Sequence, residues 1–133
     1  MFDVNVGIIG GGIAGSLAAA MLGRAGISTA LIDIHERYPE DFRAEKIQQR
    51  QIDLLVKTGL APEIVAVGVP IDLSWIACKG RLVDKQPIRE SGIAYSDLVN
   101  LTRSLIPPKV AFIHGKVSNK LLSWRTVNNY RFA

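Results

Sequence analysis

The chain has 133 residues, of which 16 are Lys or Arg, 12 are Asp or Glu and one is Cys. This length predicts a single domain with a sizeable core, and 48% hydrophobic with 21% charged residues excludes global disorder. The single cysteine excludes an internal disulfide framework and a cysteine-based zinc site.

The N-terminal part of the sequence predicts a βαβ unit. Val4–Ile9 is a short apolar run that stops at three glycines, which is typical of a strand buried on both faces. Ile13–Ala25 is rich in Ala and Leu and is followed by Gly26, which predicts a helix with a glycine at its C-terminal end. Ile27–Ile34 is apolar and β-branched, and it predicts a second strand parallel to the first.

A second helix is predicted over Arg43–Thr58, and Gly59 supplies its end. Four residues of this segment fall on one face of a 3.6-residue period: Ile47, Leu54, Leu55 and Thr58. Pro62–Val67 predicts a short helical turn.

The remaining elements are a hairpin, a helix and a strand. Leu73–Cys78 and Arg81–Gln86 flank Lys79-Gly80, the spacing of a β-hairpin. Ser96–Leu105 predicts a third helix with Ser96 as its N-cap, and Val110–His114 predicts a last strand. The whole order indicates an α/β fold, a Rossmann-like open parallel sheet with an inserted β-hairpin or meander.

A glycine-rich loop lies between the first strand and the first helix. Residues Gly10 to Gly15 fit the pattern G-x-G-x-x-G in the strand-loop-helix context that this motif requires. Gly10 permits the tight turn, Gly12 lets a pyrophosphate approach the backbone, and Gly15 lets the helix pack closely on the sheet. The backbone N–H groups and the dipole of the helix would then bind the phosphates.

An acidic residue completes the dinucleotide-binding pattern. Asp33 follows Gly15 by 18 residues and ends the second predicted strand, where a carboxylate accepts hydrogen bonds from ribose hydroxyls. The loop and the acid together predict a bound dinucleotide, and they leave FAD and NAD(P) both open.

The residues after Asp33 favour FAD, because from here the sequence resembles the FAD-dependent monooxygenases of the aromatic-hydroxylase type. That family has Arg-x-Glu opening an amphipathic helix that ends in Gly-Leu, and this chain has Arg43-Ala44-Glu45 and Gly59-Leu60. The family continues with a β-meander, a helix with an Asp-Leu start, a strand and a Val. The counterparts here include Asp97-Leu98, Phe112-Ile113 and Val117.

The resemblance implies a set of cofactor-binding residues within an FAD-binding portion at residues 1–117. The glycine loop would face the FAD pyrophosphate, Asp33 would bind the adenosine ribose, Arg43 would contact the ribose or phosphate region, and the backbone of Val117 would meet the adenine. The full set is Gly10, Gly12, Ala14, Gly15, Asp33, Arg43 and Val117. No catalytic residue and no metal ligand is implied, and NAD(P)H is a reductant in the full-length family.

Other chemically conspicuous residues have simpler interpretations. Cys78 is expected to be a buried inert thiol, and Trp75 and Tyr95 are expected to be packing residues. His35 and His114 show no metal-ligand spacing and are expected at loop or strand ends.

The resemblance also indicates missing parts. Two further flavin motifs of the family, Asp-Gly and Gly-Asp, and its β-rich substrate-covering part have no counterpart here, so the chain is expected to be a truncated or frame-shifted N-terminal piece. A second chain or a missing C-terminal part would complete the site. Whether this chain alone is an enzyme stays open. The alternatives are an NAD(P)-binding dehydrogenase domain and a non-catalytic remnant.

Residues 118–133 form an atypical basic tail, since no acidic residue follows Asp97. Its basic residues are dispersed and form no basic motif, so a nucleic-acid partner is not expected. The N-terminus lacks the positive start of a signal peptide, and its apolar run is interrupted by glycines and too short to span a membrane. We therefore expect a cytoplasmic protein without a membrane span.

Overall fold

The computed structural model describes residues 3–117, which divide into two compact units. The first unit combines the residues up to Pro39 with those from Thr102 onward, and the second unit contains Glu40–Leu101. The predicted basic tail lies outside the described residues. Among the helices of the described part, none is long and apolar enough to cross a membrane.

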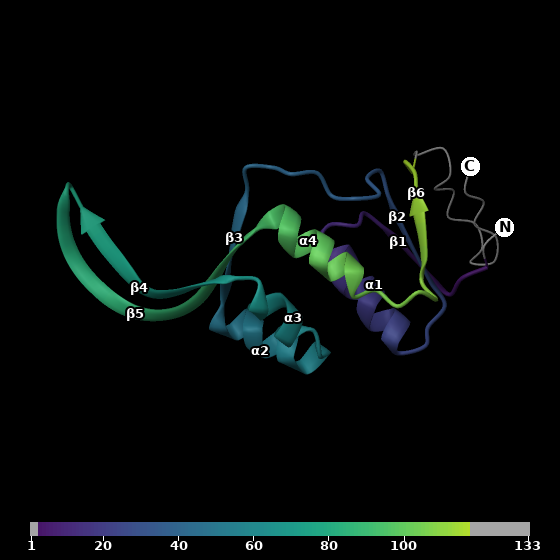
Figure 1. The fold of residues 1–133 in the computed structure, drawn as a ribbon, viewed down its shortest axis with the longest axis horizontal. Coiled ribbons are helices and arrows are strands. Elements are labelled where there is room, and N and C mark those ends of the chain that lie inside the picture. Colours follow the sequence, from purple (N-terminus) through teal and green to yellow (C-terminus); the bar gives the residue numbers. More distant parts are fainter. Residues whose placement is uncertain (1–2, 118–133) are drawn as a thin grey trace, which may run out of the picture. The chain divides into compact units, whose positions relative to one another are not determined.

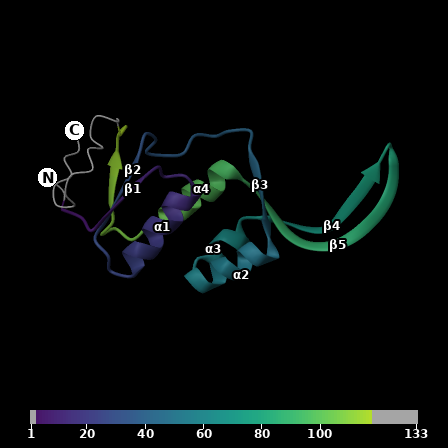
Figure 2. The ribbon, with the colours of Figure 1, turned by 180° about the vertical axis from the view of Figure 1, so that it is seen from behind.

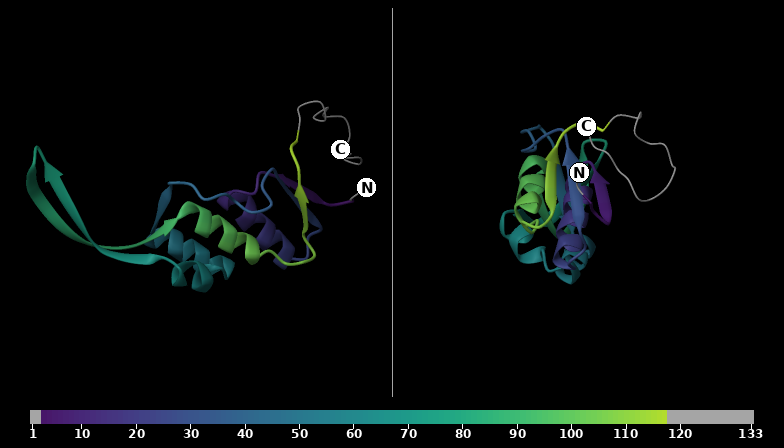
Figure 3. Two further views of the ribbon diagram at one scale, coloured as in Figure 1. Left: turned by 45° about the horizontal axis from the view of Figure 1, so that its top comes forward. Right: turned by 90° about the vertical axis from the view of Figure 1, so that its right-hand side faces the viewer.

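The first unit is a three-stranded parallel sheet with a helix on it. The strands are β1 (Val6–Ile9), β2 (Thr29–Asp33) and β6 (Ala111–His114), in the order β1-β2-β6. Figure 3 shows these purple, blue and yellow-green strands side by side. The helix α1 (Ile13–Arg24) connects β1 to β2, so the predicted βαβ unit is confirmed.

The strand that is buried is β2, whose first four residues are all buried. It has a neighbour on each side, and Leu31 belongs to a core cluster with Ala19 of α1 and Val110. The expectation that the first strand is buried on both faces is wrong, because β1 alternates half-buried and exposed residues and Ile9 is 59% exposed. Within the described residues β1 pairs with β2 alone, so only part of its surface is covered.

The second unit contains an antiparallel sheet in the order β3-β5-β4, formed by β3 (Ala44–Gln48), β4 (Val69–Cys78) and β5 (Arg81–Ala94). The helix expected over Arg43–Thr58 is therefore wrong from Arg43 to Gln48, because Ala44–Gln48 form β3. Ile47 pairs with Ser91 of β5, so this buried apolar side chain belongs to a strand and not to a helix face.

Helix α2 (Gln49–Thr58) begins only after β3, and the N–H of Gln48 donates to the side chain of Gln51 (2.8 Å). It ends at Gly59, whose φ of 71° is in the left-handed region, as predicted. The short helix α3 (Ala61–Ala66) follows and confirms the predicted helical turn. Figure 2 shows the two helices next to each other.

The predicted hairpin is confirmed, and it is longer than expected. Strands β4 and β5 form the curved two-stranded ribbon of Figure 1, and Lys79 and Gly80 both have positive φ at its turn. Most of the ribbon is exposed, so two expectations fail: Cys78 is exposed, and Trp75 is 64% exposed. The Trp75 ring instead lies under the Lys85 ammonium, 4.3 Å away.

The last helix, α4 (Tyr95–Ser104), starts one residue earlier than predicted, so Ser96 is a buried first-turn residue and not the N-cap. Tyr95 is 8% exposed, and its N–H donates to the carbonyl of Arg43 (2.8 Å), which confirms it as a packing residue. The α/β fold with a parallel sheet and an inserted β element is thus confirmed.

Candidate cofactor-binding site

The glycine loop turns from β1 into α1 in the first unit. Gly10 has a φ of 96°, a conformation that favours glycine, and its N–H donates to the carbonyl of Ile32 (2.8 Å). A Cβ at Gly15 would overlap the carbonyl oxygen of Gly10. Since that oxygen belongs to the backbone, the loop and the first turn of α1 can approach this closely only with glycine at position 15.

The N-terminus of α1 is suited to an anion. Its N-cap residue, Gly12, has no side chain to cap the helix, and the first turn, which contains Ala14, has no acidic residue. The first N–H groups of a helix lack intrahelical acceptors and carry the positive end of the helix dipole. A phosphate at this end would therefore meet N–H donors without a competing carboxylate on the helix itself.

Asp33 lies beside this loop at the end of β2. Its Oδ2 accepts from the N–H of Gly11 (2.6 Å), and its Oδ1 accepts from the N–H of His35 (2.8 Å). Burial alone would raise the pKa of Asp33, but these two N–H groups and the guanidinium of Arg103 outweigh it and keep the pKa below its ordinary value of 3.8. The carboxylate is therefore ionised and fixed in direction at neutral pH.

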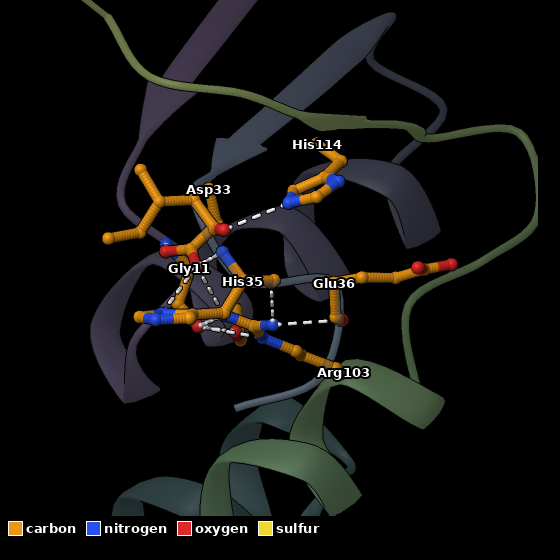
Figure 4. A network of polar contacts seen from close by, with 8 residues as sticks. Gly11, Asp33, His35, Glu36, Arg103 and His114 are labelled. Carbon is orange, nitrogen blue, oxygen red and sulfur yellow. Dashed lines mark hydrogen bonds and ion pairs between the residues drawn. The ribbon is translucent and has the colours of Figure 1, made fainter. Parts of the chain in front are cut away.

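Arg103, from the last turn of α4, joins the loop to the end of β2 (Figure 4). Its Nε and Nη2 donate to the carbonyl of Gly11 (2.9 and 2.6 Å), and Nη2 also lies 3.1 Å from Oδ1 of Asp33. Its Nη1 donates to the carbonyls of His35 (2.6 Å) and Glu36 (3.1 Å). The side chain is 8% exposed, so all five N–H donors of a nearly buried guanidinium have acceptors.

Arg43 belongs to the second unit and precedes β3. Its guanidinium donates to the carboxylate of Glu45 (3.0 and 2.7 Å) and lies 3.9 Å from the centre of the Tyr95 ring. The structure thus gives the Arg-x-Glu motif a local role, as an ion pair stacked on an aromatic ring. A contact of Arg43 with a cofactor stays a prediction.

The remaining predicted positions lie around the ends of β2 and β6. Val117 is half-buried and comes three residues after His114, the last residue of β6. His114 has a ring nitrogen 2.9 Å from the carbonyl of Ile34, and His35 lies in the turn after β2, so both histidines are at strand ends as expected. Residues 3–117 contain no group of His, Cys, Asp or Glu that could bind a metal.

Two residues of this network were missed by sequence reasoning, Gly11 and Arg103. A Cβ at Gly11 would come 2.7 Å from Nη2 of Arg103 and 3.1 Å from Cβ of Asp33, so the middle glycine of the loop is needed for a close approach. One feature of the sequence could have indicated Arg103. It follows Ser96 by seven residues and Val99 by four, so it lies on the same face of α4 as these two buried residues. A charged residue on such a face requires partners.

The sequence comparisons identify the family. Residues 3–130 match the family model described as FAD binding domain. Kynurenine 3-monooxygenase of Dictyostelium discoideum is 28% identical over 128 residues, which cover 90% of this chain and 26% of that protein. The chain therefore spans about a quarter of the length of this relative.

Solved structures show the same fold. p-Nitrophenol 4-monooxygenase PnpA of Pseudomonas putida DLL-E4 aligns with a TM-score of 0.73 and 21% identity over 80% of this chain and 30% of its own. PqsL of Pseudomonas aeruginosa aligns with a TM-score of 0.71 and 20% identity over 83% of this chain and 32% of its own. Because the family match extends across nearly the whole sequence, the chain belongs to the FAD binding domain family.

Proposed function

We propose that residues 1–117 bind the adenosine diphosphate half of FAD, with the pyrophosphate at the N-terminus of α1 and the adenosine ribose at Asp33. The observation that carries this proposal is the link between the two places: the loop residue Gly11 donates to Asp33 at 2.6 Å. The same loop thus leads into the positive end of the α1 dipole and donates a hydrogen bond to an ionised carboxylate.

The pyrophosphate fits the loop as described. Gly10 adopts the left-handed conformation in the turn from β1 into α1, and no acid in the first turn of α1 repels an anion. Gly12 and Ala14 present only backbone and one methyl group there. We assign the loop residues Gly10, Gly12, Ala14 and Gly15 to this role.

The ribose fits Asp33 with one restriction. Oδ1 already accepts from His35 and lies beside Arg103, whereas Oδ2 accepts, within residues 3–117, from Gly11 alone. A carboxylate oxygen has two acceptor directions, so one direction on Oδ2 remains for a ribose hydroxyl. We infer that Asp33 binds the ribose through one hydroxyl and not through two.

The wider function follows from the family. When bound, FAD supplies the redox chemistry, and the protein supplies binding, orientation and electrostatics. We propose that the longer protein represented by the relatives is a monooxygenase, with NAD(P)H as its reductant, and that Arg43 and the backbone of Val117 contribute cofactor contacts.

A cytoplasmic location is also a proposal, supported by the use of a single cysteine. The dehydrogenase alternative is not favoured, because the family model is that of an FAD binding domain.

Ligand titration tests the proposal. We would purify the chain without cofactor and titrate it with FAD, ADP and FMN, following flavin fluorescence for the flavins and heat for ADP. We expect FAD and ADP to bind and FMN to bind at least about tenfold more weakly, since FMN lacks the adenosine half. We expect Asp33→Ala to weaken FAD and ADP alike, while Asp53→Ala, on the exposed surface of α2, serves as the matched control.

Two outcomes would contradict the proposal. If FMN bound as tightly as FAD, the chain would recognise the flavin half. If the folded chain bound neither FAD nor ADP, the alternative of a non-catalytic remnant would be favoured.

A further inference from the structure

We propose that Arg103 is a positioning residue for the adenosine diphosphate site, fixing Asp33 and the Gly11 peptide in their binding geometry before any ligand arrives. The identity of the ligand rests on the proposed function, whereas the positioning itself rests on contacts that Arg103 makes in the chain without ligand. It adds a residue outside the glycine motif and 70 positions beyond the acid.

Three separate stretches of the chain meet at one guanidinium: the glycine loop through the carbonyl of Gly11, the end of β2 through Asp33, and the following turn through the carbonyls of His35 and Glu36. Because a guanidinium is planar and rigid, five simultaneous hydrogen-bonding contacts leave these groups little freedom relative to one another. Figure 4 shows this convergence.

A pyrophosphate at the start of α1 would be repelled by an unpaired carboxylate next to the loop. The guanidinium of Arg103 lies 3.1 Å from Oδ1 of Asp33, and both side chains are largely buried, 8% and 12% exposed, so solvent screens this pair only weakly. Arg103 therefore neutralises the carboxylate on the side opposite to the oxygen that we assign to the ribose.

Arg103 acts on a ligand only through other groups. Its donors are all engaged with the protein, so it has none left for a ligand. Its effect on binding must pass through Asp33 and through the peptide of Gly11. The N–H of Gly11 donates to Asp33, and a guanidinium offers no acceptor to it, so the exchange of this N–H reports on the effect that passes through Asp33.

The first experiment measures hydrogen exchange of the Gly11 amide by NMR in the free chain. We compare the original chain with Arg103→Met, which removes all five donors but keeps a long stem, and with Arg103→Lys, which keeps the charge but offers three donors. Arg50→Met is the matched control, since Arg50 is exposed on α2. We expect exchange at Gly11 to be at least about tenfold faster in Arg103→Met, intermediate in Arg103→Lys and unchanged in Arg50→Met.

Amides of the β2 core serve as the internal reference. If Leu31 exchanges as in the original chain while Gly11 is faster, the effect is local and supports positioning. If Gly11 exchange is unchanged in both Arg103 variants, the proposal is overturned. Should Arg103→Met fail to fold, Arg103→Lys decides the question alone: an unchanged Gly11 rate overturns the proposal, and a faster rate supports it.

The second experiment is a double-mutant cycle on FAD affinity with Asp33→Asn. We expect Arg103→Met to raise the dissociation constant of FAD at least about tenfold, and the double variant to lose clearly less than the product of the two single losses, because Arg103 acts through Asp33. If the loss of FAD affinity in the double variant equalled the product of the two single losses, the two residues would act independently and this mechanism would be overturned. Failure of the proposed function would give a different result. The original chain would not bind FAD, but exchange at Gly11 would still be faster in Arg103→Met.

Discussion

The two sheets of this chain each have a central strand, β2 in one unit and β5 in the other, and these strands are stabilised in different ways. Thr29, Ala30 and Leu31 of β2 are at most 1% exposed, whereas β5 is exposed over its first seven residues. The parallel sheet depends on burial and on contacts between distant segments. The ribbon depends on its turn and on cross-strand pairs such as Trp75 with Lys85. The candidate site therefore lies in the unit that is stabilised by burial and by contacts between segments far apart in the sequence.

The largest effect on FAD binding should come from the crowded glycine of the first unit, compared with a crowded glycine of the second. Gly15→Ala places a methyl group against the backbone oxygen of Gly10, which cannot rotate away, and should cost about 3 kcal/mol of the free energy of unfolding and abolish FAD binding. Gly68→Ala in the second unit meets the hydroxyl of Ser91, which can rotate, and should cost about 1 kcal/mol.

Urea denaturation of both variants measures this difference. Gly7→Ala is the control, since a Cβ there meets nothing within 4 Å. Adding Ser91→Ala should recover stability in the Gly68→Ala background. Equal losses for the Gly15 and Gly68 variants would break the comparison.

The next effect concerns burial. Leu31→Ala in β2 removes a fully buried side chain and should destabilise the chain by about 2–5 kcal/mol. Leu73→Ala in β4 removes a side chain that is 47% exposed and should change stability by about 0.5 kcal/mol. Thermal unfolding of the two variants gives both values. A large loss for Leu73→Ala would mean that the ribbon face is covered in solution, and it would correct our description of the second unit.

A smaller effect is the acid dependence of the first unit. The pKa of Asp33 is lower in the folded chain than its ordinary value, so its stabilisation is complete above about pH 4 and is lost as the pH falls through the lowered pKa. Asp33→Asn should therefore lower stability at neutral pH and flatten the acid side of the profile. The free energy of unfolding measured from about pH 2 to pH 7 tests this, and an Asp53→Asn profile that loses the same acid slope would contradict it.

The smallest effect should come from the turn of the ribbon. Lys79 has a φ of 49°, a conformation in which Asn is more favourable than Lys. Lys79→Asn should stabilise the ribbon by about 0.5 kcal/mol, seen as slower amide exchange in β4 and β5 and not in β2. Slower exchange in both sheets would show that the two units unfold together.

The local parts of the site could be predicted from the sequence, and the distant part could not. Gly10, Gly15 and Asp33 were found because a strand, a tight turn and a helix fix their spacing within one short segment. The position of Arg103 depends on the rotation of α4 and on a partner 92 residues earlier, and neither follows from spacing.

The wrong start of the second predicted helix has a related cause. Ile47 suited a 3.6-residue period by its spacing from Leu54, but its pairing with Ser91 makes it a strand residue. Pairing between segments more than 40 residues apart overrides a periodicity supported by so few positions. The ribbon is longer than predicted because β4 begins at Val69, and Val69–Ile71 pair with Glu90–Gly92 of β5.

The long separation between Gly11 and Arg103 has a consequence for synthesis. Ribosomes add about 5–20 residues per second, so roughly 5–18 s pass between the emergence of the loop and that of the arginine 92 residues later. Strands β1 and β2 are complete early in this interval, while β6, the neighbour of β2, is not yet made. A nascent chain therefore presents an open apolar sheet edge for seconds, and this is the stage at which a chaperone has the most surface to protect.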